Sequence, residues 1–251
     1  MNFIKKKLVV FFVLFIGILG ALGVYNLKTS SVFFAGQRRL PIYSVDTKDK
    51  KIAISFDVSW GDDKTDEILK ILEDHNAKAT FFIVGAWIDQ YPKKLKAMFD
   101  SGHEIGNHTN KHPIMTTISK EIMIREIAIT DAKIMSITGQ GTTVFRCPSG
   151  EYNNLVVETV ESTKHKCIQW DVDSIDWKEQ GAEIEYKRIV EKTKPGSILL
   201  FHNNAKYTPE NLPKILDYLK AEGYEFVRIS DLIYKENYYI DISGKQIQNK
   251  Y

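Results

Sequence analysis

The sequence predicts an α/β protein: a distorted (β/α) barrel of about seven parallel strands, preceded by an N-terminal membrane-anchor helix. β-rich runs alternate with segments of helical spacing, which is the order that builds βα units on a parallel sheet. Seven such strands fit a closed or nearly closed barrel better than a doubly wound sheet, and no glycine-rich dinucleotide loop occurs. An uncharged apolar run near the N-terminus predicts the anchor.

The N-terminal run covers residues 8–25 and follows Lys5, Lys6 and Lys7. Its roughly 17 apolar residues reach the lower limit for spanning a bilayer. The basic flank favours an N-terminus inside the cell and the rest of the chain outside. We therefore expect an anchor over residues 1–27, a linker over 28–50, and the domain that follows outside the cell membrane. A weak signal-peptidase site at residues 21–23 keeps cleavage and secretion as the alternative.

The barrel is expected over residues 51–235, where the alternation continues without a break. Strand signals cover residues 51–57, 79–84, 104–106, 143–146, 166–171, 197–202 and 225–228. Helical spacing covers residues 64–75, 91–101, 119–138, 153–162, 185–193 and 209–222. The remaining residues, 236–251, are polar and aromatic and are expected to form a surface tail.

The composition narrows the choice of partners only slightly. The chain is 43% hydrophobic and 26% charged, as in an ordinary globular protein. A formal charge of +2 gives no electrostatic reason to expect nucleic acid as a partner. Cys147 and Cys167 could form one disulfide outside the cell or remain two buried thiols, and the oligomeric state is open.

Two histidines four residues apart suggest a metal site. His108 and His112 lie in the stretch His-Thr-Asn-Lys-His-Pro, and imidazole is the commonest protein ligand for zinc-like cations. Pro113 disfavours a helical conformation at His112, so we place the pair on a loop after the third strand.

Other reactive side chains follow the remaining strands. The active site of a βα barrel forms at the carboxyl ends of its strands. Besides the histidine loop, those ends carry Asp57, Arg146, Asp176 with Trp177, and His202. Taken singly, each could be a buried histidine, a structural ion pair or a core aromatic. Their joint placement at five successive strand ends favours one shared site.

These motifs resemble the NodB-homology polysaccharide deacetylases of carbohydrate esterase family 4. The resemblance runs from about residue 51 to residue 233. It rests on Ser55-Phe56-Asp57 with Thr65, His108-Thr109-Asn110-Lys111-His112-Pro113, Arg146-Cys147-Pro148-Ser149-Gly150, Asp173-Ser174-Ile175-Asp176-Trp177 and Leu200-Phe201-His202. Within that family, the anchor and the Phe-Asp-Val-Ser-Trp-Gly stretch are most similar to those of the sporulation-associated PdaB type.

The resemblance implies a role for each residue. His108 and His112 would bind a divalent metal, with zinc first and cobalt, nickel or manganese as alternatives. Asp57 would be the general base, held by Arg146, and His202 would be the general acid, oriented by Asp176 from across the rim. The backbone N–H of Ser149 would stabilise the oxyanion. Trp177 and Leu200 would wall the groove for the acetyl methyl group.

One position departs from the family pattern. The usual third metal ligand is an aspartate directly after the base, and here that residue is Val58. Asp62 or Asp63 could replace it, because only a short loop separates them from Asp57. Acidic residues before a helix are also ordinary N-terminal charges that the helix dipole stabilises. A site of two histidines completed by water is the alternative.

The sequence thus predicts a metal-dependent hydrolase that removes N-acetyl groups from a cell-wall glycan, with peptidoglycan as the first candidate. The resemblance adds a link to sporulation. A NodB-like domain that binds wall glycan or a partner without catalysis is the alternative, and an O-acetyl esterase is a weaker one.

Overall fold

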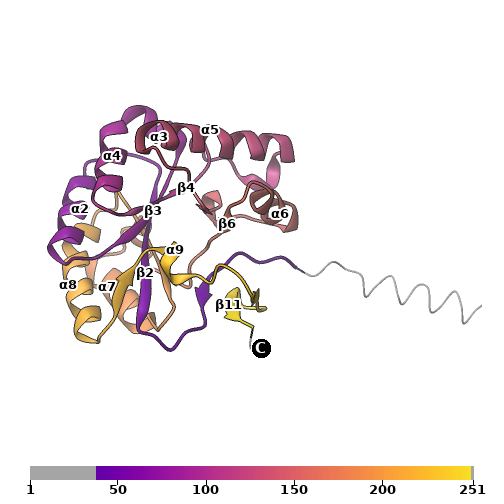
Figure 1. Cartoon of the computed structure of the whole chain (residues 1–251). Helices are drawn as coiled ribbons and strands as arrows, with labels where there is room; N and C mark the ends of the chain where they lie inside the picture. The colour runs from indigo at the N-terminus through magenta and orange to yellow at the C-terminus, as the bar shows by residue number, and fades with distance from the viewer. Residues whose placement is uncertain (1–37, 250–251) are drawn as a thin grey trace, which may run out of the picture. The chain divides into compact units, whose positions relative to one another are not determined.

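The structure is a computed structural model, and it describes residues 38–249 (Figure 1). Its main sheet contains β2 (Lys51–Val58), β3 (Ala79–Ile83), β4 (Glu104–Asn107), β5 (Val144–Phe145), β6 (Lys166–Cys167), β7 (Val172–Asp173), β8 (Ile198–His202) and β9 (Glu225–Val227). Seven of these strands lie in the order β6-β5-β4-β3-β2-β8-β7, and β9 pairs with the beginning of β2. Every pairing in this sheet is parallel, as the alternation of elements predicted.

Helices follow the strands and, apart from the short α9, lie around the outside of the sheet (Figure 1); α9 packs Ile229 and Leu232 into the cluster that contains Ala53 and Phe82. They are α2 (Thr65–Asp74), α3 (Gly85–Gln90), α4 (Pro92–Asp100), α5 (Lys120–Thr138), α6 (Asn154–Ser162), α7 (Ala182–Lys192), α8 (Thr208–Ala221) and α9 (Ile229–Leu232). Short 3₁₀ turns occur at η1 (Met115–Thr117), η2 (Pro148–Gly150) and η3 (Asp176–Lys178). The last two turns carry predicted site residues.

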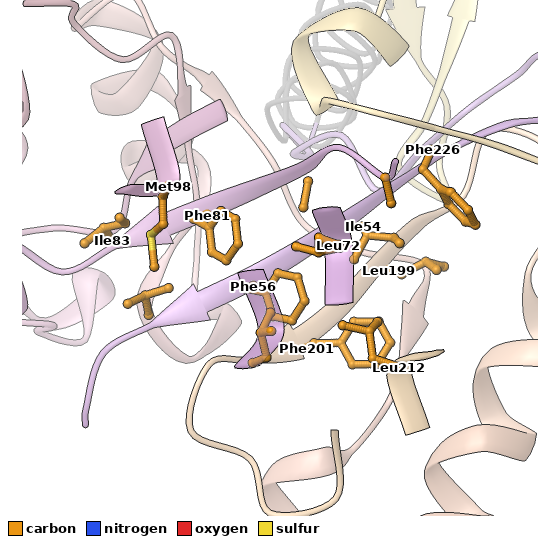
Figure 2. Packing of buried hydrophobic residues seen from close by; sticks show 14 of the residues in the cluster. Ile54, Phe56, Leu72, Phe81, Ile83, Met98, Leu199, Phe201, Leu212 and Phe226 are labelled. Carbon is orange, nitrogen blue, oxygen red and sulfur yellow. The ribbon is translucent and has the colours of Figure 1, made fainter. Parts of the chain in front are cut away.

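Strand β2 shows how the sheet separates the core from the site. Ile52, Ile54, Phe56 and Val58 belong to the apolar cluster that the helices cover. Successive side chains on a strand point to opposite faces, so the residues between them, Asp57 included, face the barrel interior. In Figure 2 the rings of Phe56, Phe81 and Phe201 come from three neighbouring strands, and Phe56 lies 5.0 Å from Phe81 and 5.6 Å from Phe201 between ring centroids.

The segment before β2 forms bridges to the chain just after β6 and to the residue just before β8. The Ile42 N–H donates to the carbonyl of Cys167 (2.9 Å), and the Gln169 N–H donates to the carbonyl of Ile42 (2.7 Å). Three residues on, the Val45 N–H donates to the carbonyl of Gly196 (2.9 Å). Gly196 has φ +80°, and a Cβ there would lie 1.9 Å from the Val45 carbonyl oxygen, so only glycine permits this approach.

A second, three-stranded sheet joins segments near both ends of the described chain. It has the order β1-β11-β10, from β1 (Ser44–Val45), β10 (Tyr238–Ile240) and β11 (Lys245–Gln248). The sequence analysis placed these strands in the linker and in the surface tail. The predicted domain boundaries remain predictions, but residues 44–45 pair with residues 245–246, and residues 238–240 pair with residues 246–248.

Most of the predicted elements are present, with a few differences. Of the predicted strand over residues 166–171, only residues 166–167 form a strand, β6; β7 begins one residue beyond the predicted range, and α3 and α9 were not predicted. The predicted anchor over residues 1–27 lies outside the described residues. Within residues 38–249, none of the helices has the length and apolar composition needed to cross a bilayer.

Candidate active site

A cavity of about 470 Å³ opens at the carboxyl ends of the strands. Nearly all of the predicted site residues meet there, together with aromatic and polar side chains that the sequence analysis did not single out. Its lining consists of Asp57, Ser59, Trp60, His108, His112, Ser149, Gly150, Trp170, Asp173, Asp176, Trp177, Glu179, Leu200, His202, Asn204 and Ala205. Arg146 lies beneath this lining and is fully buried.

Asp57 and Arg146 form a buried ion pair at the cavity floor. Arg146 Nη1 donates to Asp57 Oδ1 (2.8 Å), and Arg146 Nη2 donates to Ser55 Oγ (2.8 Å) and to the carbonyl of Gln169 (3.1 Å). Burial alone would raise the pKa of Asp57, but the Arg146 charge, with His108 and His202 nearby, holds that pKa below its usual value. Asp57 is therefore an anion at neutral pH, with Oδ2 free of the guanidinium and available to accept a proton.

The two histidines of the predicted metal loop lie side by side, with ring centroids 5.0 Å apart. His108 Nδ1 lies 2.8 Å from the carbonyl oxygen of Arg146, so Nδ1 carries the proton and Nε2 carries the lone pair. Burial lowers the pKa of His108 to about 4 and also lowers the pKa of His112. Both rings are therefore neutral at pH 7, which is the form that binds metal.

The surroundings of His108 fit a bound cation. Its Nε2 lone pair faces Asp57 Oδ2 at 3.6 Å, so two buried acceptors meet without a proton between them. A cation beside these atoms relieves that conflict, and the Nδ1–H bond to a backbone carbonyl is the usual second contact of a ligating histidine. The donor set of His108 and His112 thus suits a divalent transition metal, with the other coordination positions left to water and substrate.

The predicted third ligand does not join these histidines. Val58 is fully buried in the apolar cluster beneath the helices, on the opposite face of β2 from Asp57. An Asp62 carboxylate oxygen lies 3.9 Å from Lys94 Nζ, and Asp63 is exposed just before α2. Neither aspartate lines the cavity, and within residues 38–249 no cluster of three or more His, Cys, Asp or Glu is arranged to hold a metal.

His202 and Asp176 form the second charged pair of the cavity. His202 Nδ1 lies 2.7 Å from Asp176 Oδ1, and the His202 backbone N–H donates to Asp176 Oδ2 (2.7 Å). Burial would lower the pKa of His202, but the hydrogen bond and charge of Asp176, with Asp57 and Asp173, raise it above its usual value. The ring thus binds a proton readily, and its Nε2 is the nitrogen left for the cavity.

The cavity lining includes Ser149, expected to supply the oxyanion N–H, and Leu200 and Trp177, expected to form the groove wall. Ser149 is exposed, lines the cavity and has a left-handed backbone (φ 55°) within the η2 turn. Leu200 is buried on β8, whereas Trp177 is 58% exposed at the rim. The three side chains come from separate strand ends and border one space.

Two tryptophans of this cavity were missed by the sequence analysis. Trp60 is 61% exposed, and its ring lies 5.1 Å from the His112 ring between centroids. The carbonyl of the next residue, Gly61, accepts from Trp87 Nε1 (2.7 Å) and Asn203 Nδ2 (2.9 Å), which fixes this loop. Trp170 lies 5.4 Å from the Arg146 guanidinium. For Trp60, the position two residues after β2 was the available signal, whereas Trp170 fell inside the predicted strand over residues 166–171.

The two cysteines are free thiols in this structure. Cys147 and Cys167 are buried, with their sulfur atoms 3.7 Å apart. The contact with Cys147 and burial raise the pKa of the Cys167 thiol. This thiol is therefore protonated and unreactive at neutral pH.

Comparison with known proteins places the chain in a family. The family model for polysaccharide deacetylase matches residues 44–168. A peptidoglycan-N-acetylglucosamine deacetylase of Bacillus cereus is 33% identical over 196 residues, which cover 76% of this chain and 92% of that protein. The peptidoglycan-N-acetylglucosamine deacetylase PgdA of Listeria monocytogenes is 36% identical over 201 residues, 80% of this chain, but the chain spans only 42% of PgdA.

A solved structure shows the same fold. It is that of a CE4-family pseudoenzyme from Bacillus anthracis, which matches with a TM-score of 0.74 at 33% identity and covers 76% of this chain and 68% of its own. The fold, the cavity residues and these similarities agree. The chain belongs to the polysaccharide deacetylase family.

Proposed function

We propose that this chain is a metal-dependent hydrolase that removes N-acetyl groups from cell-wall peptidoglycan. The observation that carries the proposal is the pairing of two charged couples in one cavity, Asp57 with Arg146 and His202 with Asp176. Hydrolysis of an amide needs a base for the attacking water and an acid for the leaving amine. The names of the relatives from Bacillus cereus and Listeria monocytogenes suggest the substrate class.

The proposed mechanism assigns one proton transfer to each couple. Asp57 Oδ2 accepts a proton from the attacking water while Arg146 keeps the carboxylate fixed. His202 donates a proton from Nε2 to the amine nitrogen, and Asp176 holds the opposite ring nitrogen. The Ser149 N–H stabilises the negative oxygen of the tetrahedral intermediate. Leu200 and Trp177 exclude water from around the acetyl methyl group.

His108 and His112 would hold the metal, for which zinc is the first choice. When bound, it lowers the pKa of a coordinated water and polarises the acetyl carbonyl. Cobalt, nickel or manganese suit the same imidazole donors.

We further propose that residues 1–27 anchor the chain in the cell membrane, with the barrel outside, and that the protein acts in sporulation. Support comes from the basic flank and apolar run at the N-terminus and from the resemblance of the Phe-Asp-Val-Ser-Trp-Gly stretch. Protease treatment of intact cells should digest the barrel, and cell fractionation should retain the chain with membranes. Recovery of a shortened chain in the medium would support cleavage instead.

A second candidate function is binding of wall glycan without catalysis. The burial of Val58 away from the histidines favours it, because the site then lacks a third protein ligand. The Bacillus anthracis relative is a pseudoenzyme, so the family contains proteins of this kind.

Metal analysis combined with acetate release separates the two functions. The purified protein is supplied with peptidoglycan or with acetylated chito-oligosaccharide, with zinc, cobalt, nickel or manganese added in turn. If the chain is a hydrolase, we expect it to bind metal stoichiometrically and to release acetate. His112→Ala should lose the metal, and Asp57→Asn should lose the acetate release. His75→Ala is the matched control, because that histidine lies at the end of α2. Glycan binding that survives both variants, with no turnover by the parent protein under any metal, would establish the binding function instead.

A further inference from the structure

A second buried carboxylate lies behind the His202–Asp176 couple. Glu185 on α7 is 3% exposed, and Thr208 at the start of α8 connects it to Asp176. Thr208 Oγ1 lies 2.8 Å from Glu185 Oε1 and 3.1 Å from Asp176 Oδ2. The helices α7 and α8 that bring these side chains together lie side by side (Figure 1).

A count of hydrogens assigns the protonation of this chain of contacts. Asp176 already accepts from His202 Nδ1, from the His202 N–H and from the Trp177 N–H (2.8 Å), so Asp176 is the anion. The Thr208 hydroxyl has a single hydrogen and can donate it to only one carboxylate. If it donates to Asp176, the hydrogen between Thr208 and Glu185 must come from Glu185. With the hydroxyl hydrogen directed to the anion Asp176, the contact between Thr208 and Glu185 is a hydrogen bond only when Glu185 is the neutral acid.

The other oxygen of Glu185 supports this assignment. Glu185 Oε2 is buried and has no hydrogen-bond partner within the part of the chain that the structure describes. A bare carbonyl oxygen of a neutral acid is tolerated there at modest cost, whereas a bare anionic oxygen is not.

The groups that face Glu185 agree with a proton held at neutral pH. Burial raises the pKa of Glu185 to about 7; Asp176 and, on α8, Glu210 act in the same direction, while Thr208 and Asn211 oppose them. On its own helix, Arg188 is occupied with the carbonyl of Asp173. His202 connects to Glu185 through Asp176 and Thr208.

We propose that Glu185 is a positioning residue which, as a neutral acid, steadies Asp176 through Thr208 and withdraws that support when it ionises. The catalytic meaning of this device rests on the proposed function, but its proton coupling does not. With Glu185 ionised, one hydroxyl hydrogen serves two carboxylates, and a second negative charge lies behind Asp176. The electrostatic surroundings of His202 therefore change above the pH at which Glu185 loses its proton.

NMR of the histidine rings tests the coupling without any substrate. The ring carbons of the six histidines of the full-length chain are followed from about pH 5 to pH 9, and His202 is assigned with a His202→Gln variant. We expect the His202 signal to show an extra inflection near pH 7, the value to which burial raises the pKa of Glu185. Glu185→Gln should remove that inflection and leave the native signals of the other histidines in place.

Glu183→Gln is the matched control, because it makes the same charge change two residues earlier on α7 at an exposed position. The inflection should persist in this variant. A wild-type curve without the inflection, or an inflection that survives Glu185→Gln, would overturn the proposal.

A second pair of variants tests the connecting hydroxyl. Thr208→Ser keeps the hydroxyl and should keep the inflection, whereas Thr208→Val should abolish it. If the protein releases acetate, Thr208→Val should also lower kcat by about tenfold, the usual loss for one hydrogen bond to a charged group, and Thr208→Ser should restore it. Equal curves for both variants would contradict the link. If the inflection behaves as expected but the protein releases no acetate, the proposed function is refuted and the Glu185 proposal stands.

Discussion

Asp57 and His202 occupy paired positions on the adjacent strands β2 and β8. The proposed base and the proposed acid therefore come from neighbouring strands. The resemblance had implied that Asp176 orients His202 from across the rim. Their supports lie in different directions: Arg146 comes from the end of β5, and Asp176 comes from the η3 turn after β7. Each group can therefore be perturbed by replacing the residue that supports it, Arg146 for Asp57 and Asp176 for His202.

Replacing Arg146 with methionine should destabilise the fold by about 3–5 kcal/mol, because it leaves Asp57 as a buried, unpaired charge. The lowered pKa of Asp57 contributes stability that is present above its unfolded value and lost as pH falls through the folded value. The loss in Arg146→Met should therefore be largest at neutral pH and shrink below about pH 4. Urea unfolding at several pH values measures it.

Arg228→Met is the control for that experiment. Arg228 pairs with Asp231 on the surface at 2.7 Å, and breaking an exposed pair costs about 1 kcal/mol or less. Equal losses for the two arginines would refute the buried-charge explanation.

Asp176→Asn should shift the alkaline limb of the pH–rate profile to lower pH. Asp176 is the main group that raises the pKa of His202, so the protonated ring should be lost earlier on the alkaline side in the variant. Acetate release measured as kcat/KM against pH gives the shift. Asp173→Asn should move the limb less, because Asp173 contributes less to that pKa, and a larger shift from Asp173 would contradict the assignment.

Val58→Asp should destabilise the protein by about 3 kcal/mol and should not raise its affinity for zinc. The new carboxylate would face the apolar cluster beneath the helices instead of His108 and His112. Calorimetric titration with zinc and thermal unfolding measure the two effects, with Val58→Asn as the uncharged control. A tenfold rise in zinc affinity in Val58→Asp alone would show that the end of β2 turns this residue toward the histidines.

Trp60→Ala should weaken substrate binding and leave stability within about 0.5 kcal/mol of the parent. The indole is mostly exposed at the cavity rim, so its removal leaves no buried void but takes away an aromatic face next to the site. We expect KM for a glycan substrate to rise about 3–10-fold with little change in kcat. Tyr239→Ala, which removes an exposed ring on β10, should leave KM unchanged. The reverse pattern would exclude Trp60 from substrate binding.

The sequence predicts the centre of the site well, because order along the chain encodes it. Asp57, His108, Arg146 and His202 each follow a strand, and parallel strands deliver their carboxyl ends to one rim. The orientation of the Val58 side chain was not predicted, because the predicted strand ended at residue 57, whereas β2 continues to residue 58. Once the strand includes residue 58, the alternation of its side chains places valine in the core.

Features made by tertiary contact could not be predicted in this way. Strands β1 and β10 have two and three residues, too short for any periodic pattern. The Glu185–Thr208 contact joins two helices whose separate patterns carry no sign of a shared hydrogen bond. In each case the information lies in how distant segments pack.

The hydrogen bonds of Ile42 and Val45 also decide where the chain can be shortened. A truncated form starting at residue 51, where the first predicted strand begins, would remove the hydrogen-bond partners of β6 and Gly196. It would also expose the apolar surface that Ile42 and Val45 cover. It would also leave β11 without β1. Such a form would expose unpaired strand edges to other copies of the chain and should precipitate. A form that retains the residues from 39 onward keeps those edges hydrogen-bonded.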